Sequence, residues 1–382
     1  MSFLQNIGFA AALAPKLIGY RLSKAGLMKP PMPIILVYSI TSACQSLCKS
    51  CNIGLVYQKN PLVIKNDLKI DEIEKIFKSV GHVFYFNISG GEPFLRADIP
   101  QIVELACKHL KPKVIHVPTN ALAPELIEKK TREIMEIIKT YGNKTVFTIK
   151  PSYDGIGKDH DIIRGVDGNF VKLMDTLERL KKLRGEYKNL EVGLGTVISK
   201  LNMHKIKEIA DYAKKQDVDT YISEIAEKRE EMFNLKDDVT PSAEEYEKTI
   251  GLFKEEIRKD MKGKSFLSKF IQAFRLTYYD IAVRIIKEQR QVIQCYGGSG
   301  SVHLNAQGNL WPCATLAYSK VMGNVRDFNY DFKKLYYSDK AEEVRSHVFA
   351  KRCACPLAGV SYVNIPLSLR ALASLAKNML IN

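Results

Sequence analysis

Short β-rich runs alternate with helix-like segments over about half of this sequence, and this alternation restricts its fold more than any other feature. The β-rich runs occupy residues 34–40, 83–89, 114–119, 145–152, 191–198 and 219–225. Helical patterns fill the intervals at residues 70–80, 99–109, 124–141, 170–183 and 203–216. Repeated βα units of this kind build a parallel sheet covered by helices. Six units predict an α/β fold in the form of a partial (β/α)6 TIM barrel, with functional groups on the loops that follow the strands.

The sequence as a whole divides into regions of different texture. We expect an apolar, basic N-terminal helical segment at residues 1–32 and the partial barrel at residues 33–230. A helical linker at residues 231–290 leads to a small C-terminal α+β domain at residues 291–358, and a C-terminal amphipathic helix occupies residues 359–382. In the linker, Thr240 is the expected N-cap and Pro241 the first helical residue. A second linker helix carries apolar residues at helical spacing, which predicts a face packed on the barrel: Phe266, Phe270, Phe274, Tyr278, Ile281 and Ile285.

Three cysteines follow the first predicted strand directly. Cys44, Cys48 and Cys51 form a C-x3-C-x2-C pattern in TSACQSLCKSCNIG. A structural zinc site uses four protein ligands, whereas a cubane iron-sulfur cluster held by three thiolates keeps one iron free for another ligand. The spacing therefore favours a 4Fe-4S cluster, and a zinc site completed by a distant residue is the alternative.

The second predicted strand ends in the turn NISGGEPF. Gly90 and Gly91 permit a close approach of the backbone, and Glu92 adds a negative charge near the strand end. Such a turn could hold a cationic amino group, although by itself Gly-Gly-Glu-Pro is also an ordinary tight turn. Its place after the second strand, with the three cysteines after the first, favours a binding role.

The cysteine triad and this turn together resemble the signature of the radical S-adenosylmethionine (SAM) superfamily. The resemblance implies a 4Fe-4S cluster on the three cysteines, whose free iron chelates SAM while Gly90-Gly91-Glu92 contacts the SAM amino group. It implies reductive cleavage of SAM to methionine and a 5′-deoxyadenosyl radical, with a reducing partner such as ferredoxin or flavodoxin. Many members carry an aromatic residue directly before the third cysteine, where this chain has Ser50.

The fourth predicted strand leads into PSYDGIGKDHDIIRGVDGNF. This stretch resembles one found in the peptide- and cofactor-modifying branch of the superfamily, and the resemblance implies that Ser152 and Arg164 reach the ribose or carboxylate of SAM. A serine hydroxyl and an arginine fork are suited to such contacts. Asp154 and Gly155 are expected to form a turn.

Four further cysteines lie near the C-terminus. Cys295 and Cys313 bracket a Gly-rich segment, and Cys353 and Cys355 follow in RCACP. Four thiolates could close a zinc site or ligate a second 4Fe-4S cluster completely. The segment from Cys295 to Cys313 resembles the SPASM and twitch extensions of radical SAM enzymes, and the cysteine count implies one auxiliary cluster. Cys107 lies in an apolar helical segment and is expected to be a core residue.

Charge and hydropathy restrict the surroundings of the protein. A formal charge of +15 favours acidic partners or anionic surfaces. No secretory signal and no run of about 20 apolar residues is present, which predicts a cytoplasmic location. Both ends are apolar and basic, so they either lie on a membrane surface, at the inner face, or pack on the barrel. The lysines are dispersed and no RNA-binding module is recognisable, so a nucleic-acid partner is not expected.

These patterns predict a radical SAM enzyme that abstracts hydrogen from an unidentified peptide or protein, cofactor precursor or membrane lipid. The alternative is a non-catalytic iron-sulfur electron-transfer protein or metal-binding scaffold. Such a protein would explain the cysteines, but it has no need of Gly90-Gly91-Glu92 or Arg164.

Overall fold

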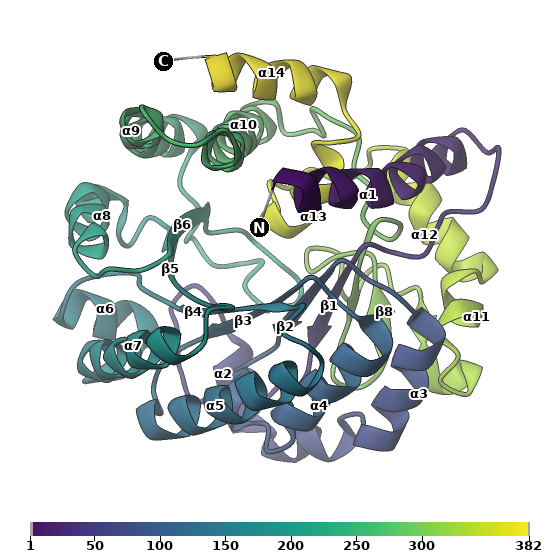
Figure 1. Ribbon diagram of the computed structural model, residues 1–382, viewed down its shortest axis with the longest axis horizontal. Helices are drawn as coiled ribbons and strands as arrows, with labels where there is room; N and C mark the ends of the chain where they lie inside the picture. Colours follow the sequence, from purple (N-terminus) through teal and green to yellow (C-terminus); the bar gives the residue numbers. More distant parts are fainter. Residues whose placement is uncertain (1–2, 381–382) are drawn as a thin grey trace.

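Six parallel strands form the centre of the molecule in the computed structural model, which describes residues 3–380 (Figure 1). They are β1 Ile35–Ser39, β2 Tyr85–Ser89, β3 Val114–Thr119, β4 Val146–Pro151, β5 Leu190–Ile198 and β6 Thr220–Ile225. Each strand pairs in parallel with the next along the chain. The predicted α/β fold with six βα units is therefore confirmed, including the position of every strand.

Helices in the βα connections cover the outer side of this sheet. They are α2 Ile53–Lys59, α3 Ile70–Val80, α4 Ile99–Leu105, α5 Pro124–Thr140, α6 Lys158–Arg164, α7 Asn169–Glu186 and α8 Ile206–Lys214. The amphipathic α3 shows why they pack there, since its apolar residues Ile73, Ile76 and Phe77 are all buried. The other face of the strands points into the barrel. On β3 and β4 every second residue is buried under the helices, and the residues between them face the interior.

The C-terminal region extends the same sheet. Strand β7 Ser301–Leu304 pairs in parallel with β1, and β8 Asn309–Trp311 and β9 Gly323–Asn324 follow in antiparallel pairing. The sheet therefore has nine strands in the order β6-β5-β4-β3-β2-β1-β7-β8-β9. Because β7 lies beside β1, the segment that carries the C-terminal cysteines is brought to the loop that carries the first three.

The linker contains two long helices, α9 Ala243–Met261 and α10 Phe266–Glu288. The prediction that Thr240 caps the first of them is wrong. Ser242 is the N-cap, because its hydroxyl accepts a hydrogen bond from the Glu245 N–H while the Glu245 carboxylate accepts one from the Ser242 N–H. This reciprocal capping box satisfies two free N–H groups, and its Ser-x-x-Glu pattern was present in the sequence.

The apolar face predicted for the second linker helix is buried over only part of its length. Tyr278, Ile281 and Ile285 on α10 are buried as expected. Phe266 and Phe270 are 68% and 39% exposed, so the prediction that they pack on the barrel is wrong. The first turns of α10 are therefore exposed to solvent, whereas the later turns pack against the rest of the protein.

Residues 3–24 and 369–380, the first and last helices of the described chain, lie on the side of the sheet opposite α3, α4 and α5 (Figure 1). At the N-terminus is α1 Phe3–Lys24, and the C-terminal region adds α11 Phe332–Tyr336, α12 Asp339–Phe349, α13 Ala358–Asn364 and α14 Leu369–Leu380. Pro366 lies between the last two helices, where it lacks the N–H that a continuous helix needs. Helix α14 packs on α10, and the Asn378 amide donates to the Thr277 hydroxyl at 3.1 Å. Among residues 3–380, no helix is both long and apolar enough to span a membrane.

Candidate functional site

A cavity of about 370 Å³ lies inside the barrel. Its wall contains residues from all six barrel strands and from the C-terminal region. The volume falls within the range of small-molecule binding sites. Cys44, Cys48 and Cys51 line this cavity together with Cys313, so the structure brings the two cysteine sets to one space.

The first three cysteines lie in the loop between β1 and α2. Burial raises the pKa of the Cys44 thiol to about 11 and that of Cys51 to about 12, and it also raises the pKa of Cys48. The positive charge of Arg164 opposes this effect at Cys44 and Cys48. In the absence of metal these thiols are therefore neutral at physiological pH, and a bound metal would deprotonate them.

Gly90 and Gly91 allow the turn after β2 to lie directly against the cysteine loop. A Cβ atom on Gly90 would lie 2.3 Å from the Thr41 carbonyl oxygen, and one on Gly91 would lie 2.2 Å from that of Ala43. The Gly91 N–H donates to the Thr41 carbonyl at 2.9 Å. Both glycines also line the cavity. Only glycine permits this contact between the two backbones, which keeps the turn and the cysteines in a constant relative position.

Glu92 is buried beneath the same turn, at 2% exposure. Its carboxylate accepts hydrogen bonds from the Thr119 hydroxyl at 2.9 Å and from the N–H groups of Asn120 and Phe94 at 2.6 and 3.1 Å. Burial raises its pKa to about 6 despite these bonds. Glu92 thus joins the β2 loop to the β3 loop, while the predicted contact with a SAM amino group stays a prediction. The Asn120 amide of the joined loop lies 4.0 Å from the Cys44 sulfur.

Ser152 and Arg164 both line the cavity, as a shared site requires. Ser152 directly follows β4 and bridges to Gly195 of β5. Arg164 ends α6, and its Nη1 donates to the Asp154 carboxylate at 3.1 Å. The other Asp154 oxygen accepts from the Val197 N–H at 2.8 Å. Asp154 therefore holds the Arg164 guanidinium, a role that its assignment as a turn residue missed. An acidic residue three positions beyond the end of β4, on the side where functional groups gather, was the available signal.

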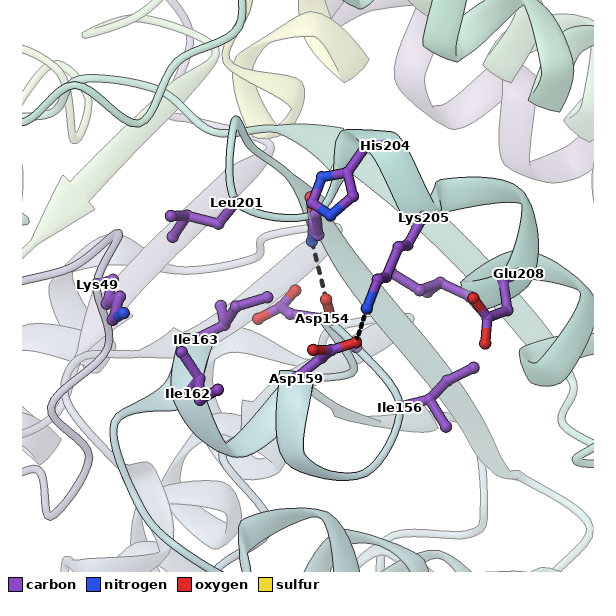
Figure 2. Close-up of a pocket in the computed structure, with 13 residues that line it drawn as sticks. Lys49, Asp154, Ile156, Asp159, Ile162, Ile163, Leu201, His204, Lys205 and Glu208 are labelled. Atoms are coloured by element: carbon purple, nitrogen blue, oxygen red, sulfur yellow. Dashed lines mark hydrogen bonds and ion pairs between the residues drawn. The ribbon is translucent and has the colours of Figure 1, made fainter.

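Asp154 also lines a second, smaller cavity, shown in Figure 2. This cavity of about 90 Å³ is lined by Lys49, Asp154 and Asp159, together with residues of the β5–α8 connection. The exposed ion pair between Lys205 and Asp159 lies at its rim. Asp154 lines this small cavity, while its partner Arg164 lines the larger one. Their buried ion pair contrasts with the exposed pair of Lys205 and Asp159 beside it.

The four C-terminal cysteines come together in the structure. Burial raises the pKa of Cys313 to about 12, and the nearby Cys295 and Cys353 raise it further. Cys355 is affected in the same way by Cys313 and Cys295. The Gln291 amide donates to the Cys353 sulfur at 3.2 Å, and the Gly297 N–H to that of Cys295 at 3.4 Å. Hydrogen bonds to sulfur of this kind tune iron-sulfur clusters.

Two further points concern Cys107 and the arrangement of possible metal ligands. Cys107 is buried in the π-helical turn Ala106–Leu110 and belongs to the apolar core, as expected. In the described part of the chain, no group of three or more His, Cys, Asp or Glu side chains, the two cysteine sets included, is arranged around a single metal-ion position.

Several polar residues of the cavity wall were not identified from the sequence. They are Asn87, His116, Lys150, Glu224, Glu227, Arg229, Glu231 and His303. Four of them form part of a buried network or an ion pair. The Ser39 hydroxyl lies 2.9 Å from a Glu231 oxygen and 2.7 Å from His303 Nε2, and Arg229 pairs with Glu227. Polar residues at inward strand positions were the signal that could have found Asn87, His116 and Lys150.

Family models match both the barrel and the C-terminal cysteine region of this chain. Residues 38–213 match the model of the radical SAM superfamily, and residues 295–356 match SPASM, an iron-sulfur cluster-binding domain. The first match contains the cysteine triad, the glycine turn, Ser152 and Arg164. The second begins at Cys295 and ends just beyond Cys355.

Individual proteins with similar sequences and folds agree with these matches. The antilisterial bacteriocin subtilosin biosynthesis protein AlbA of Bacillus subtilis is 23% identical over 89% of this chain and 69% of its own length. The AdoMet-dependent heme synthase of Methanosarcina barkeri is 24% identical over 77% of this chain and 80% of its own.

Among solved structures, Streptococcus suis SuiB aligns with a TM-score of 0.60 at 16% identity, over 85% of this chain and 70% of that one. Native anSMEcpe with bound AdoMet and the Cp18Cys peptide aligns with a TM-score of 0.57 at 20% identity, over 83% and 84%. These two likenesses concern the fold. The two family models, which together match more than half of the chain, show that it belongs to the radical SAM superfamily, as an enzyme with a C-terminal SPASM domain.

Proposed function

We propose that the large cavity is the reaction chamber of this radical SAM enzyme, and that Cys44, Cys48 and Cys51 ligate its SAM-binding 4Fe-4S cluster. The observation that carries this proposal is the common cavity, which is lined by all three cysteines, by Gly90 and Gly91, and by Arg164. Three thiols fit a cluster with one open iron. The Nε of Arg164 is buried without a hydrogen-bond partner among the described residues, so it is free for a ligand carboxylate.

A 4Fe-4S cluster held by Cys44, Cys48 and Cys51 would supply the electron for reductive cleavage of SAM, and with it the hydrogen-abstracting chemistry of the enzyme. The residues of this chain bind, orient and shield. Arg164, held by Asp154, and the Ser152 hydroxyl bind the polar groups of SAM. The apolar side chains of Ile35, Val37 and Val302 on the cavity wall exclude water from the radical.

For the C-terminal set, we propose that Cys295, Cys313, Cys353 and Cys355 ligate one auxiliary 4Fe-4S cluster. The support is their mutual proximity, the N–H groups directed at two of their sulfurs, and the place of Cys313 on the cavity wall. A cluster held there would supply a site beside the substrate that accepts or relays an electron, or ligates the substrate. Zinc at this site is the alternative.

A peptide is the substrate class that the similar proteins support best. AlbA is named for the biosynthesis of a bacteriocin, and the anSMEcpe structure contains a peptide. A ferredoxin or flavodoxin is the proposed reductant in the cytoplasm. The formal charge of +15 supports this pairing, because it attracts acidic proteins at long range.

The test of the proposed function is anaerobic reconstitution with iron and sulfide, followed by SAM and dithionite and measurement of 5′-deoxyadenosine. We expect about eight irons per chain and formation of 5′-deoxyadenosine. Cys48→Ala should lose about half of the iron and all SAM cleavage, whereas Cys107→Ala, a matched change of a buried cysteine, should retain both. A fully loaded protein that forms no 5′-deoxyadenosine would support the non-catalytic alternative instead. Full iron retention in a Cys295→Ala, Cys313→Ala double variant would contradict the auxiliary cluster.

We also propose that the protein attaches peripherally to anionic membranes through a terminal apolar face, defined as Ile18 and Leu22 of α1 with Leu369, Leu372 and Leu380 of α14. Ile18 is 59% and Leu369 74% exposed, and both helices carry lysine or arginine. Exposed leucines beside basic residues are typical of interfacial helices. The burial of the apolar side chains before Leu13 is not described, so the proposal rests on Ile18, Leu22, Leu369, Leu372 and Leu380.

Co-sedimentation with vesicles of anionic and of neutral lipid tests this attachment. We expect pelleting with anionic vesicles only, and its loss in a Leu369→Ser, Leu380→Ser variant. Leu235→Ser, a change of an exposed leucine in the segment after β6, serves as the matched control and should pellet like the natural protein. Equal pelleting of all three would exclude the terminal apolar face.

A further inference from the structure

Polar side chains line the interior of the barrel at inward-facing strand positions. In such barrels these positions are ordinarily filled by branched apolar side chains. We call this region the polar wall and define it as Asn87 of β2, His116 of β3, Lys150 of β4 and Glu224 of β6. All four residues line the large cavity. Lys150 of β4 lies two residues before Ser152, which directly follows the strand, and both residues line the cavity. The polar wall therefore adjoins the proposed SAM site.

Strand β5 leaves room for the Lys150 side chain. A Cβ atom on Gly195 would lie 3.1 Å from Lys150 Cδ, and one on Gly193 would lie 3.5 Å from its Cε. The lysine stem therefore crosses the strand at two positions without side chains. This arrangement directs the ammonium group toward β6, where Glu224 contributes a favourable charge interaction.

The ammonium group of Lys150 has no hydrogen bond or ion pair with another described residue. Glu224 is likewise without an ion pair in the described part of the chain, so the two charges interact only at longer range. Burial lowers the pKa of Lys150 to about 8, which leaves it mostly charged at neutral pH. An unpaired cation in a cavity is costly, and a substrate group of opposite charge would offset that cost.

His116 adds no second positive charge to the polar wall. Its Nδ1 lies 2.8 Å from the Thr148 hydroxyl, which itself donates to the Ile115 carbonyl. In this arrangement Nδ1 donates to the hydroxyl, which leaves Nε2 as an acceptor toward the cavity. Burial and the nearby Lys150 lower the pKa of His116 well below its usual value, which keeps the ring neutral. Asn87 offers a buried amide oxygen that has no partner among the described residues.

We propose that the polar wall is the substrate-recognition subsite of this enzyme, and that Lys150 binds a carboxylate of the substrate there. This inference rests on the proposed function only in taking the large cavity as the substrate site. A single lysine matches the single negative charge of a carboxylate. A phosphate dianion would carry excess charge next to Glu224 and Glu191, which both already interact with Lys150.

Peptide carboxylates come from two sources, the chain terminus and the side chains of Asp and Glu, and the test separates them. The loaded protein with SAM is titrated anaerobically by calorimetry with benzoylglycine, with the α-amide of benzoylaspartate, and with benzoylglycinamide. The first carries a terminal carboxylate, the second a side-chain carboxylate, and the third none. We expect at least one acid to bind about tenfold or more tightly than the amide, which a charged hydrogen bond provides.

The variants assign this preference to Lys150. Lys150→Met keeps the length and apolar stem of the side chain and should abolish the preference for the acid, whereas Lys150→Arg should restore it. Lys334→Met, a change of an exposed lysine, should bind like the natural protein. Thermal melting of each variant shows that it is folded. The proposal is overturned if no acid binds better than the amide, or if Lys150→Met retains the preference. Neither result depends on 5′-deoxyadenosine formation, so failure here is distinct from failure of the proposed function.

Discussion

At the scale of single residues, burial decides which charged pair matters. Asp154 and Arg164 form a buried ion pair, with side-chain exposures of 2% and 13%, between β4 and α6. Lys205 and Asp159 form an exposed pair close by, as Figure 2 shows for the residues that it labels. Exposed pairs contribute little, whereas removal of one partner from a buried pair leaves an uncompensated charge.

We therefore predict that Asp154→Asn lowers the free energy of unfolding by about 3 kcal/mol and weakens SAM binding, because Arg164 loses its anchor. Asp159→Asn, the same chemical change in the exposed pair, should alter neither quantity measurably. Denaturant titration and SAM binding of the loaded protein measure the two effects. Equal stability of both variants would show that Asp154 does not hold Arg164.

A second prediction at this scale concerns His160, which is fully buried and accepts a hydrogen bond from the Asp154 N–H at 3.2 Å. Burial lowers its pKa from 6.5 to about 4. As the pH falls below 6.5, the unfolded chain binds a proton that the folded protein does not, so stability is lost on acidification. From pH 7.5 to 5.5 this loss amounts to about 1.4 kcal/mol. Urea titrations over this pH range should show that the free energy of unfolding falls more steeply on acidification for the natural protein than for His160→Gln. Equal pH dependence of the two proteins would contradict the prediction.

At the scale of elements, the start of α9 shows how local hydrogen bonds set a helix boundary. Both Thr240 and Ser242 are residue types that cap helices, and only the second has a glutamate three positions later. We predict that Ser242→Ala lowers the free energy of unfolding by about 1 kcal/mol. Thr240→Ala should have a smaller effect, because the Thr240 hydroxyl has no hydrogen-bond partner among the described residues. Denaturant titration of both variants provides the comparison, and a larger loss for Thr240→Ala would contradict the assignment of the cap.

At the scale of the whole molecule, the two cysteine regions share one sheet. Strand β1 pairs with β2 on one side and with β7 on the other, so no sheet edge separates the barrel from the SPASM region. The register pairs Val37 with His303, and both residues line the cavity. The two cysteine regions are therefore parts of one continuous sheet rather than of separate sheets.

We predict a single cooperative unfolding transition for the loaded protein. Trp311 of β8 is the one tryptophan of the chain and is buried, so its fluorescence reports on the SPASM region. Far-UV circular dichroism reports mainly on the helices of the barrel. The two midpoints should coincide, and both should fall together in the Cys295→Ala, Cys313→Ala variant, because a cluster that binds only the folded state stabilises it. Separate midpoints for the two probes would contradict this coupling.

The sequence by itself determined the six strands, most of the helices and the cysteine spacing, because periodicity and ligand spacing are local properties of a chain. The tertiary structure alone decided that β7 pairs with β1, which brings Cys313 to the cavity of Cys44. It also decided that Asp154 holds Arg164 and that Lys150 faces the cavity without an ionic partner. Phe266 and Phe270 were wrongly expected to be buried, since helical periodicity identifies an apolar face without showing how far its cover extends. These outcomes depend on contacts between residues far apart in the chain, and burial and charge pairing are properties of such contacts.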